Sequence, residues 1–159
     1  MTTSATHAIV VVECTGKGCW LISRVRKALK LGQGKRQFHQ KPVNLETANS
    51  TKMLLILVFA CERDWALAQH LKAEMNDDKN ENNTRLKFSV AKKLSKAVKN
   101  ALLLLKIAHE KLDIRSIVEV EAYTAFMVGL QLLDVAKDFK SALQELLKAK
   151  LLYQKLGET

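Results

Sequence analysis

Proline is nearly absent from this chain: Pro42 is the only one in 159 residues, and four of the six glycines lie between Gly16 and Gly34. Proline breaks helices, whereas β-rich folds need frequent turns built from proline and glycine. The long stretch after Pro42 is therefore free to form long helices. With 48% apolar residues the chain can also bury one hydrophobic core. We predict an all-α fold of antiparallel helical hairpins, forming a single domain over residues 1–159, and leave open whether residues 1–16 are ordered.

Apolar residues recur at the spacing of an α-helix in five segments. The predicted helices span Cys19–Leu31, a stretch ending near Met75, Thr84–Leu112, Ser116–Ala136 and Phe139–Leu156. The apolar face of the first helix should consist of Leu21, Val25, Ala28 and Leu29. The glycines of Gly32-Gln33-Gly34 are expected to end this helix.

The second predicted helix is apolar on most sides, which indicates the central element of the core. Its N-terminal cap should be Thr47, Asn49 or Ser50. A polar loop over Asn76–Asn83 follows it. The last two helices are joined by a short turn, so they should form an antiparallel hairpin similar to a tetratricopeptide helix pair.

Positive charge is concentrated in two parts of the chain. The net charge is +10; residues 17–41 contain eight Lys or Arg and no acid, and residues 84–113 contain eight against two acids. A surface that only keeps a protein soluble mixes both signs. The two blocks therefore indicate an anionic partner, of which nucleic acid is the typical one.

The first basic block predicts an RNA-binding site on the first helix and on the basic, irregular segment Lys35–Lys41 that follows it. Cations without intervening carboxylates repel one another unless phosphates neutralise them, and arginine can also stack on an unpaired base. The residues concerned are Lys17, Arg24, Arg26, Lys27, Lys30, Lys35, Arg36 and Lys41. A merely solvated basic arm is the alternative interpretation.

The second basic block lies on the third helix, where its cations fall within about 80° of arc. The stripe consists of Arg85, Lys92, Lys96, Lys99 and Lys106, and Lys93 is added to the candidate RNA contacts. The opposite, apolar side should consist of Val90, Ala91, Leu94, Val98, Ala101, Leu102 and Leu105. The alternative interpretation, a solvated helix face without a ligand, is stronger here than in the first block. Because lysine makes point-charge contacts and arginine can form forked ones, we expect arginines to position RNA and lysines to attract it.

Two tryptophans are the aromatic side chains considered for base stacking. Trp65 lies in an alanine- and leucine-rich part of the second helix, which indicates a core position. Trp20 borders the basic face but also continues the apolar stripe of the first helix, so both interpretations stay open for it.

Signatures of catalysis, metals and cofactors are missing from the sequence. Glu62 and Asp64 flank Arg63 on different helix faces, which predicts ion pairing rather than acid–base chemistry. The spacing of Cys14 and Cys19 is poor for zinc, and no glycine-rich stretch has the setting of a phosphate loop. We therefore predict a protein that is not an enzyme, has no metal and needs no cofactor.

The compartment follows from cysteine usage and hydropathy. Three cysteines are an odd number, and no signal peptide is recognisable, which indicates a reducing, cytoplasmic environment. The longest unbroken apolar run, Met53–Cys61, is less than half of the roughly 20 residues that a membrane-spanning helix needs. We therefore expect no membrane insertion.

Several short stretches follow one another in a specific order. They are Arg24-Val25-Arg26-Lys27-Ala28-Leu29, Glu62-Arg63-Asp64-Trp65, Lys96-Ala97-Val98-Lys99 and Glu121-Ala122-Tyr123-Thr124-Ala125-Phe126, followed by Phe139-Lys140, Ala142 and Tyr153-Gln154-Lys155-Leu156. In this order, they resemble the RNA-binding domain of the sixty-eight-kilodalton subunit of the eukaryotic signal recognition particle, over Cys19–Leu156.

The resemblance implies an all-helical, tetratricopeptide-like domain that binds the S domain of the particle's RNA near its three-way junction. It assigns Arg24, Arg26 and Lys27 to an RNA groove. It also implies a cytoplasmic particle with a nucleolar assembly stage, which contacts the ribosome and targets nascent proteins to the ER. The family protein is longer, so this chain would be its N-terminal part, with the seventy-two-kilodalton partner subunit bound beyond Thr159.

Two other classes of function stay open from the residues alone. A tetratricopeptide-like scaffold could use the basic blocks to bind an acidic peptide in a helical groove. A helix over residues 17–31 could instead lie on an anionic membrane surface, although its apolar face is modest and lacks flanking aromatics.

Overall fold

The computed structural model describes residues 18–31, 42–48, 51–75 and 83–158, and within these ranges all regular secondary structure is helical. A first helix covers residues 18–28. It is followed by α2 (Thr51–Met75), α3 (Thr84–Lys111), α4 (Ile114–Gln131), a π-helical turn η1 (Leu132–Ala136) and α5 (Phe139–Glu158). The predicted all-α class is confirmed.

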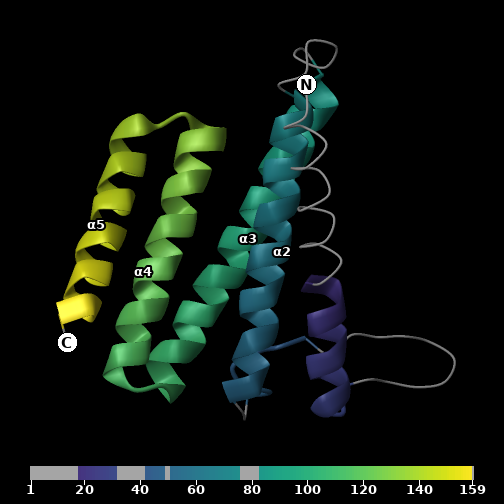
Figure 1. Cartoon of the computed structure of the whole chain (residues 1–159), viewed down its shortest axis with the longest axis vertical. Coiled ribbons are helices and arrows are strands. Elements are labelled where there is room, and N and C mark those ends of the chain that lie inside the picture. The colour runs from purple at the N-terminus through teal and green to yellow at the C-terminus, as the bar shows by residue number, and fades with distance from the viewer. Residues whose placement is uncertain (1–17, 32–41, 49–50, 76–82, 159) are drawn as a thin grey trace, which may run out of the picture.

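Neighbouring helices in the sequence are neighbours in space and run antiparallel to each other (Figure 1). α2 packs along α3 and α4 packs along α5, and the contact between α3 and α4 joins these two hairpins. The hairpin predicted for the last two helices is therefore present, and a second hairpin precedes it. The first helix lies against α2 on the side away from α4 and α5 (Figure 1).

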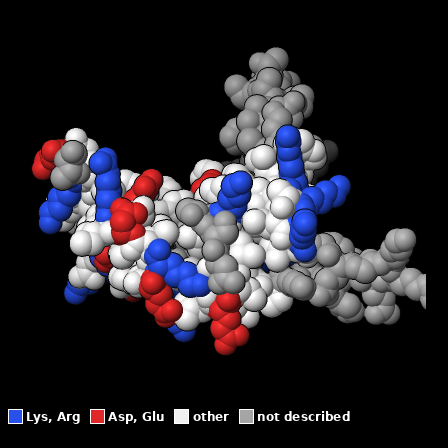
Figure 2. Space-filling model, turned by 90° about the horizontal axis from the view of Figure 1, so that it is seen from below, with Lys and Arg blue, Asp and Glu red and all other residues white. Residues whose placement is uncertain are grey.

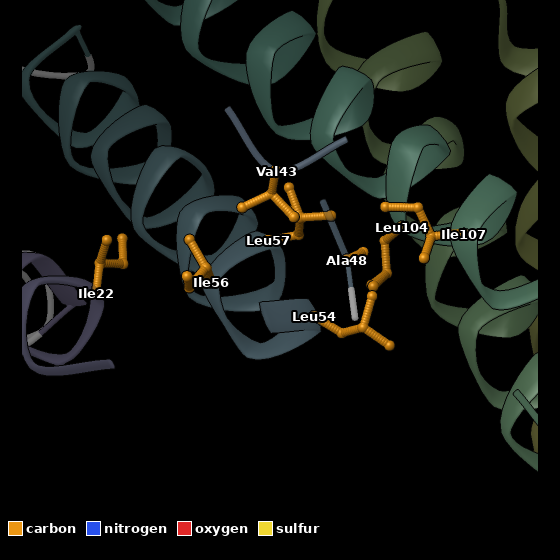
Figure 3. Packing of buried hydrophobic residues seen from close by; sticks show 8 residues of the cluster. All are labelled: Ile22, Val43, Ala48, Leu54, Ile56, Leu57, Leu104 and Ile107. Carbon is orange, nitrogen blue, oxygen red and sulfur yellow. The ribbon is translucent and has the colours of Figure 1, made fainter. Parts of the chain in front are cut away.

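The core is built around α2, as its composition predicts. Figure 3 shows the largest cluster of buried side chains, where the first helix, the turn at residues 42–48, α2 and α3 meet. Its members are Ile22, Val43, Ala48, Leu54, Ile56, Leu57, Leu104 and Ile107. Two further clusters extend along α2: Cys61 packs with Val98, Ala101 and Met127, and Ala68 packs with Val90 and Leu94.

The first helix ends earlier than its sequence predicts, and glycine is not what ends it. Lys30 has a positive φ of 52°, and its amide N–H donates to the Lys27 carbonyl. The Leu31 N–H donates to the Arg26 carbonyl at 2.9 Å, which completes a Schellman cap. Leu31 then packs against the largest core cluster, so its burial favours a left-handed conformation that lysine seldom adopts.

The apolar face of the first helix also differs from the prediction. Ile22 is buried, Val25 and Leu29 pack against the same cluster, and Ala28 is exposed. On α3 the predicted Leu102 is exposed, whereas Ala97, Leu104 and Ile107 are buried. In both cases the buried face is rotated towards α2, because a helix that packs on two neighbours buries a different arc from the one its own sequence favours.

Side-chain caps account for several helix boundaries. The Asn83 side chain accepts hydrogen bonds from Arg85 N and Leu86 N, so α3 begins where predicted. Thr47, one of three predicted caps for α2, instead accepts from Asn44 N at 2.8 Å and stabilises the preceding turn. The other two, at positions 49 and 50, lie outside the described residues. α4 ends at Gln131 rather than at Ala136, because the chain widens there into η1 and reverses at Lys137, whose φ is 57°.

One helical segment, Ile114–Ala136, is long and apolar enough to cross a membrane by length and composition. The segment contains no long unbroken apolar run, because charged residues such as Glu119 and Glu121 interrupt it. Core helices of soluble proteins meet the same two criteria, and α4 is packed between α3 and α5. This segment is therefore weak evidence for a membrane span.

The burial of Cys61 leads to a prediction about its reactivity. Its Sγ lies 3.4 Å from the Ala97 carbonyl oxygen, to which it donates, and burial raises the pKa of the thiol to about 12. The reactive thiolate is therefore scarce at pH 8. We expect iodoacetamide to modify Cys19, which is exposed, and to leave Cys61 unmodified in the native protein. Peptide mass spectrometry measures both sites, with the denatured protein as the control; equal native rates would contradict this packing.

Candidate nucleic-acid interface

The exposed cations of the first helix form the core of the candidate interface. Arg24, Lys27 and Lys30 are exposed, and they surround the helix on the side away from its buried face. In Figure 2, the blue side chains at the right of the view, on the side of the first helix, have no red side chains among them. The other predicted members of this block, Lys17, Lys35, Arg36 and Lys41, lie outside the described residues.

Of the two interpretations left open for Trp20, the structure excludes the core position, and base stacking stays a prediction. Its side chain is 56% exposed, so it is not part of the core. The guanidinium of Arg24 lies over the indole ring, with its central carbon 4.9 Å from the ring centroid. This cation–π contact holds Arg24 against the helix surface and leaves the indole accessible beside the cations. Trp65, by contrast, is half-buried and packs against the core clusters around Cys61 and Ala68, as predicted.

Arg26 is half-buried, in contrast to its neighbours on the first helix. It lines a cavity of about 280 Å³ where the first helix, α2 and α3 meet, together with Arg63 and Lys96. Burial lowers the pKa of Arg26, although a guanidinium stays charged at neutral pH. Arg26 therefore lies at a junction between helices, behind the exposed cations of the first helix.

A single buried carboxylate holds two of these cations in place. Asp64 is 1% exposed, and its Oδ1 lies 3.1 Å from Arg63 Nη2 while its Oδ2 lies 3.6 Å from Lys96 Nζ. The ion pair predicted for Arg63 is therefore present, and Glu62 points to another face, where it accepts from the Tyr123 hydroxyl. Among the described residues, this junction brings together Arg26, Arg63 and Lys96 around the Asp64 carboxylate.

Arg63 is not among the predicted RNA contacts, because the acids Glu62 and Asp64 on both sides of it offset its charge in the sequence. The structure places it against the start of the first helix: a Cβ added at Gly18 would lie 3.4 Å from the Cβ of Arg63. Lys96 reaches the same junction from α3. The two basic blocks, residues 17–41 and 84–113, therefore meet where Arg26 and Lys96 line one cavity together with Arg63 from α2.

The lysine stripe of α3 lies on the side opposite the core, as predicted. Its exposed members are Arg85, Lys92, Lys96, Lys99 and Lys106, whereas Lys93 is half-buried. Because Lys96 also contacts Asp64 on α2, the stripe continues into the junction behind the first helix. No group of three or more His, Cys, Asp or Glu side chains suited to a metal ion occurs among the residues that the structure describes.

Stacked helical hairpins with an acid-free cationic helix at one edge define an all-helical protein equipped to bind a polyanion. The model of the SRP68 family, described as RNA-binding signal recognition particle 68, matches residues 19–159. The chain therefore belongs to the SRP68 family, an RNA-binding family of signal recognition particle subunits rather than a known enzyme family.

Curated relatives support this assignment. The signal recognition particle subunit SRP68 of Dictyostelium discoideum is 31% identical over 142 residues, and that of Drosophila melanogaster is 34% identical over 143 residues. Each match covers 86% of this chain but only 22% and 23% of the relative. The chain thus spans less than a quarter of the length of these proteins.

A solved structure shows the same fold. The SRP68-RBD from Chaetomium thermophilum superposes with a TM-score of 0.77 at 21% sequence identity. The match covers 96% of this chain and 70% of that one. The arrangement of helices described above is therefore an SRP68-RBD fold.

Proposed function

We propose that this chain binds signal recognition particle RNA through the exposed cations of its first helix, with the α3 stripe as a second contact. The observation that supports this most strongly is the cluster of exposed cations formed by Arg24 and Lys27 on the first helix and Lys30 at its C-terminal cap, within a segment, residues 17–41, whose sequence contains no acid. Phosphates supply the missing counter-charge. Membership of the SRP68 family supports particle RNA as the ligand. The proposed site within this RNA is the S domain near the three-way junction.

The biological role proposed for the chain follows from that RNA. As part of the cytoplasmic particle, after a nucleolar assembly stage, it helps to assemble or remodel the RNA for targeting nascent proteins to the ER. The seventy-two-kilodalton partner subunit binds elsewhere in the longer protein, and contact with the ribosome is indirect. These roles rest on membership of the SRP68 family.

The acidic-peptide scaffold has weaker support. A cavity of about 380 Å³ between α2, α3 and η1 is lined by Lys72, Lys87 and Lys137. However, Asp134 accepts a hydrogen bond from Lys72 Nζ at 2.7 Å, so one of the three lysines is already paired. On the first helix, which contains no acid, Arg24 and Lys27 are exposed cations, and this arrangement favours RNA over an acidic peptide in the cavity.

A charge-removal experiment tests the RNA interface. We expect Arg24→Ala/Lys27→Ala to weaken binding to a folded S-domain RNA, and to reduce the slope of log K against log salt by about 2, roughly one per lost phosphate contact. Fluorescence anisotropy over a salt series measures both quantities. Arg26 is left unchanged because its half-buried side chain also contributes to packing.

The matched control removes two cations elsewhere. Lys140 and Lys150 are exposed on α5, in a part of the chain without net charge, so Lys140→Ala/Lys150→Ala lowers the net charge equally. The control should retain nearly all affinity and preference over an unrelated duplex of equal length. Equal losses in the two variants would show that only overall charge matters, and would contradict the proposed site.

A further inference from the structure

Four aromatic side chains surround a groove where α2, α4 and α5 meet. Trp65 comes from α2, Tyr123 and Phe126 from α4, and Tyr153 from α5. The groove has a volume of about 230 Å³, and Met127 and Glu62 complete its lining. Phe126 and Tyr153 are exposed at its rim, so the groove opens to solvent. Its lining residues come from α2, α4 and α5, and the first helix lies on the other side of α2 (Figure 1).

The charge of this groove is opposite to that of the rest of the molecule. Among the described residues that line it, Glu62 is the only charged one, although the whole chain has a net charge of +10. The Tyr123 hydroxyl donates to Glu62 Oε1 at 2.7 Å, which links α2 to α4 and fixes the carboxylate at the edge of the aromatic rings.

A second carboxylate adds to the negative potential. Burial raises the pKa of Tyr153, and the nearby charges of Glu119 and Glu62 raise it further. Burial also raises the pKa of Tyr123, and the hydrogen bond to Glu62 raises it further, so both phenols stay neutral at physiological pH. Neutral aromatic faces beside a carboxylate are an arrangement that attracts cations.

The indole of Trp65 contributes a buried N–H group beside the groove. Its Nε1 is shielded from solvent and has no hydrogen-bond acceptor among the residues that the structure describes. A shielded N–H without a partner destabilises a fold, and most such groups are satisfied by protein, water or a ligand.

We propose that this groove binds a lysine or arginine side chain from a basic peptide segment of another protein. The cationic group would lie against the faces of Trp65, Tyr123, Phe126 or Tyr153, with Glu62 as its counter-charge. This site is separate from the proposed RNA interface, because the first helix packs on the other side of α2. One face of the domain would then bind a polyanion and the other a cationic protein segment.

Tryptophan fluorescence offers a direct test. The chain has two tryptophans, so Trp20→Phe leaves Trp65 as the only reporter, inside the groove. In this background, an arginine-containing Gly/Ser peptide with blocked ends should change the emission of Trp65 saturably at physiological salt. The same peptide with glutamates in place of the arginines should not.

Two variants separate the groove from general attraction. We expect Glu62→Gln, which can still accept from Tyr123, and Phe126→Ala, at the exposed rim, each to weaken peptide binding by about fivefold or more. Glu110→Gln removes a carboxylate from the exposed end of α3 and should change nothing. No saturable response to the arginine peptide, equal binding of the glutamate peptide, or equal effects of Glu62→Gln and Glu110→Gln would overturn the proposal. Circular dichroism verifies that each variant is folded.

Discussion

Replacement of Ile107 by alanine is expected to lower the free energy of unfolding by about 2–5 kcal/mol. Ile107 is 0% exposed, and it lies in the largest core cluster with Leu54, Leu57 and Leu104 (Figure 3). The shorter side chain loses its transfer free energy from water and leaves a cavity between α2 and α3. Long, straight helices on both sides cannot readily collapse into that space, so the loss should be near the upper part of the range.

Urea denaturation followed by circular dichroism measures this change, with the slope m as a check on two-state behaviour. The matched control is Leu102→Ala, which shortens an apolar side chain on the same helix at a position that is 50% exposed. The control should lose less than about 1 kcal/mol, because half of that residue's surface already contacts water. Similar losses at the two positions would mean that α3 does not present Ile107 to the core.

Replacement of Gly129 by valine is the second change with a large expected effect. A Cβ at this position would lie 2.8 Å from both Cγ and Cδ2 of Leu146, and 3.4 Å from the Ala142 carbonyl oxygen. The two Cγ methyl groups of valine would increase the overlap, so α4 and α5 have to separate or Leu146 has to leave its position. We expect a loss of about 1–3 kcal/mol, although valine favours a helix more than glycine does.

The control for this variant uses another glycine of the same hairpin. A Cβ added at Gly157, near the end of α5, meets nothing within 4 Å. Gly157→Val should therefore leave the melting temperature unchanged or raise it slightly. If Gly129→Val were as well tolerated as Gly157→Val in thermal unfolding, the close approach of α4 to α5 would be refuted.

Sequence patterns predict the long helices well, because helix periodicity and polar caps are local signals. α3 begins at Thr84 as predicted, where the Asn83 side chain caps it, and it ends one residue before the predicted Leu112. The start of α5 at Phe139 is also as predicted. The π-helical turn η1 has no such signal: its wider backbone depends on how α4 meets α5, and that contact is not visible in the local sequence.

Tertiary contacts explain most of the remaining differences. The first helix buries Ile22 rather than Ala28, because it packs against α2 and the turn at Val43 together. The sequence prediction assigns both Arg24 and Arg26 to RNA, yet only Arg26 is half-buried, at the junction with α3. The two basic blocks could therefore be predicted from the sequence. Where they meet depends on how the first helix, α2 and α3 pack together, which the sequence alone does not show.

The contact between Trp20 and Arg24 affects the entropy of binding. A free arginine side chain explores many rotamers, and fixing it on a ligand opposes association by about 0.5–1.5 kcal/mol. Because the indole already restricts the Arg24 guanidinium at 4.9 Å, part of this ordering takes place during folding. In the proposed RNA interface, Trp20 would thus strengthen binding without touching RNA, by limiting the number of conformations from which Arg24 must be selected.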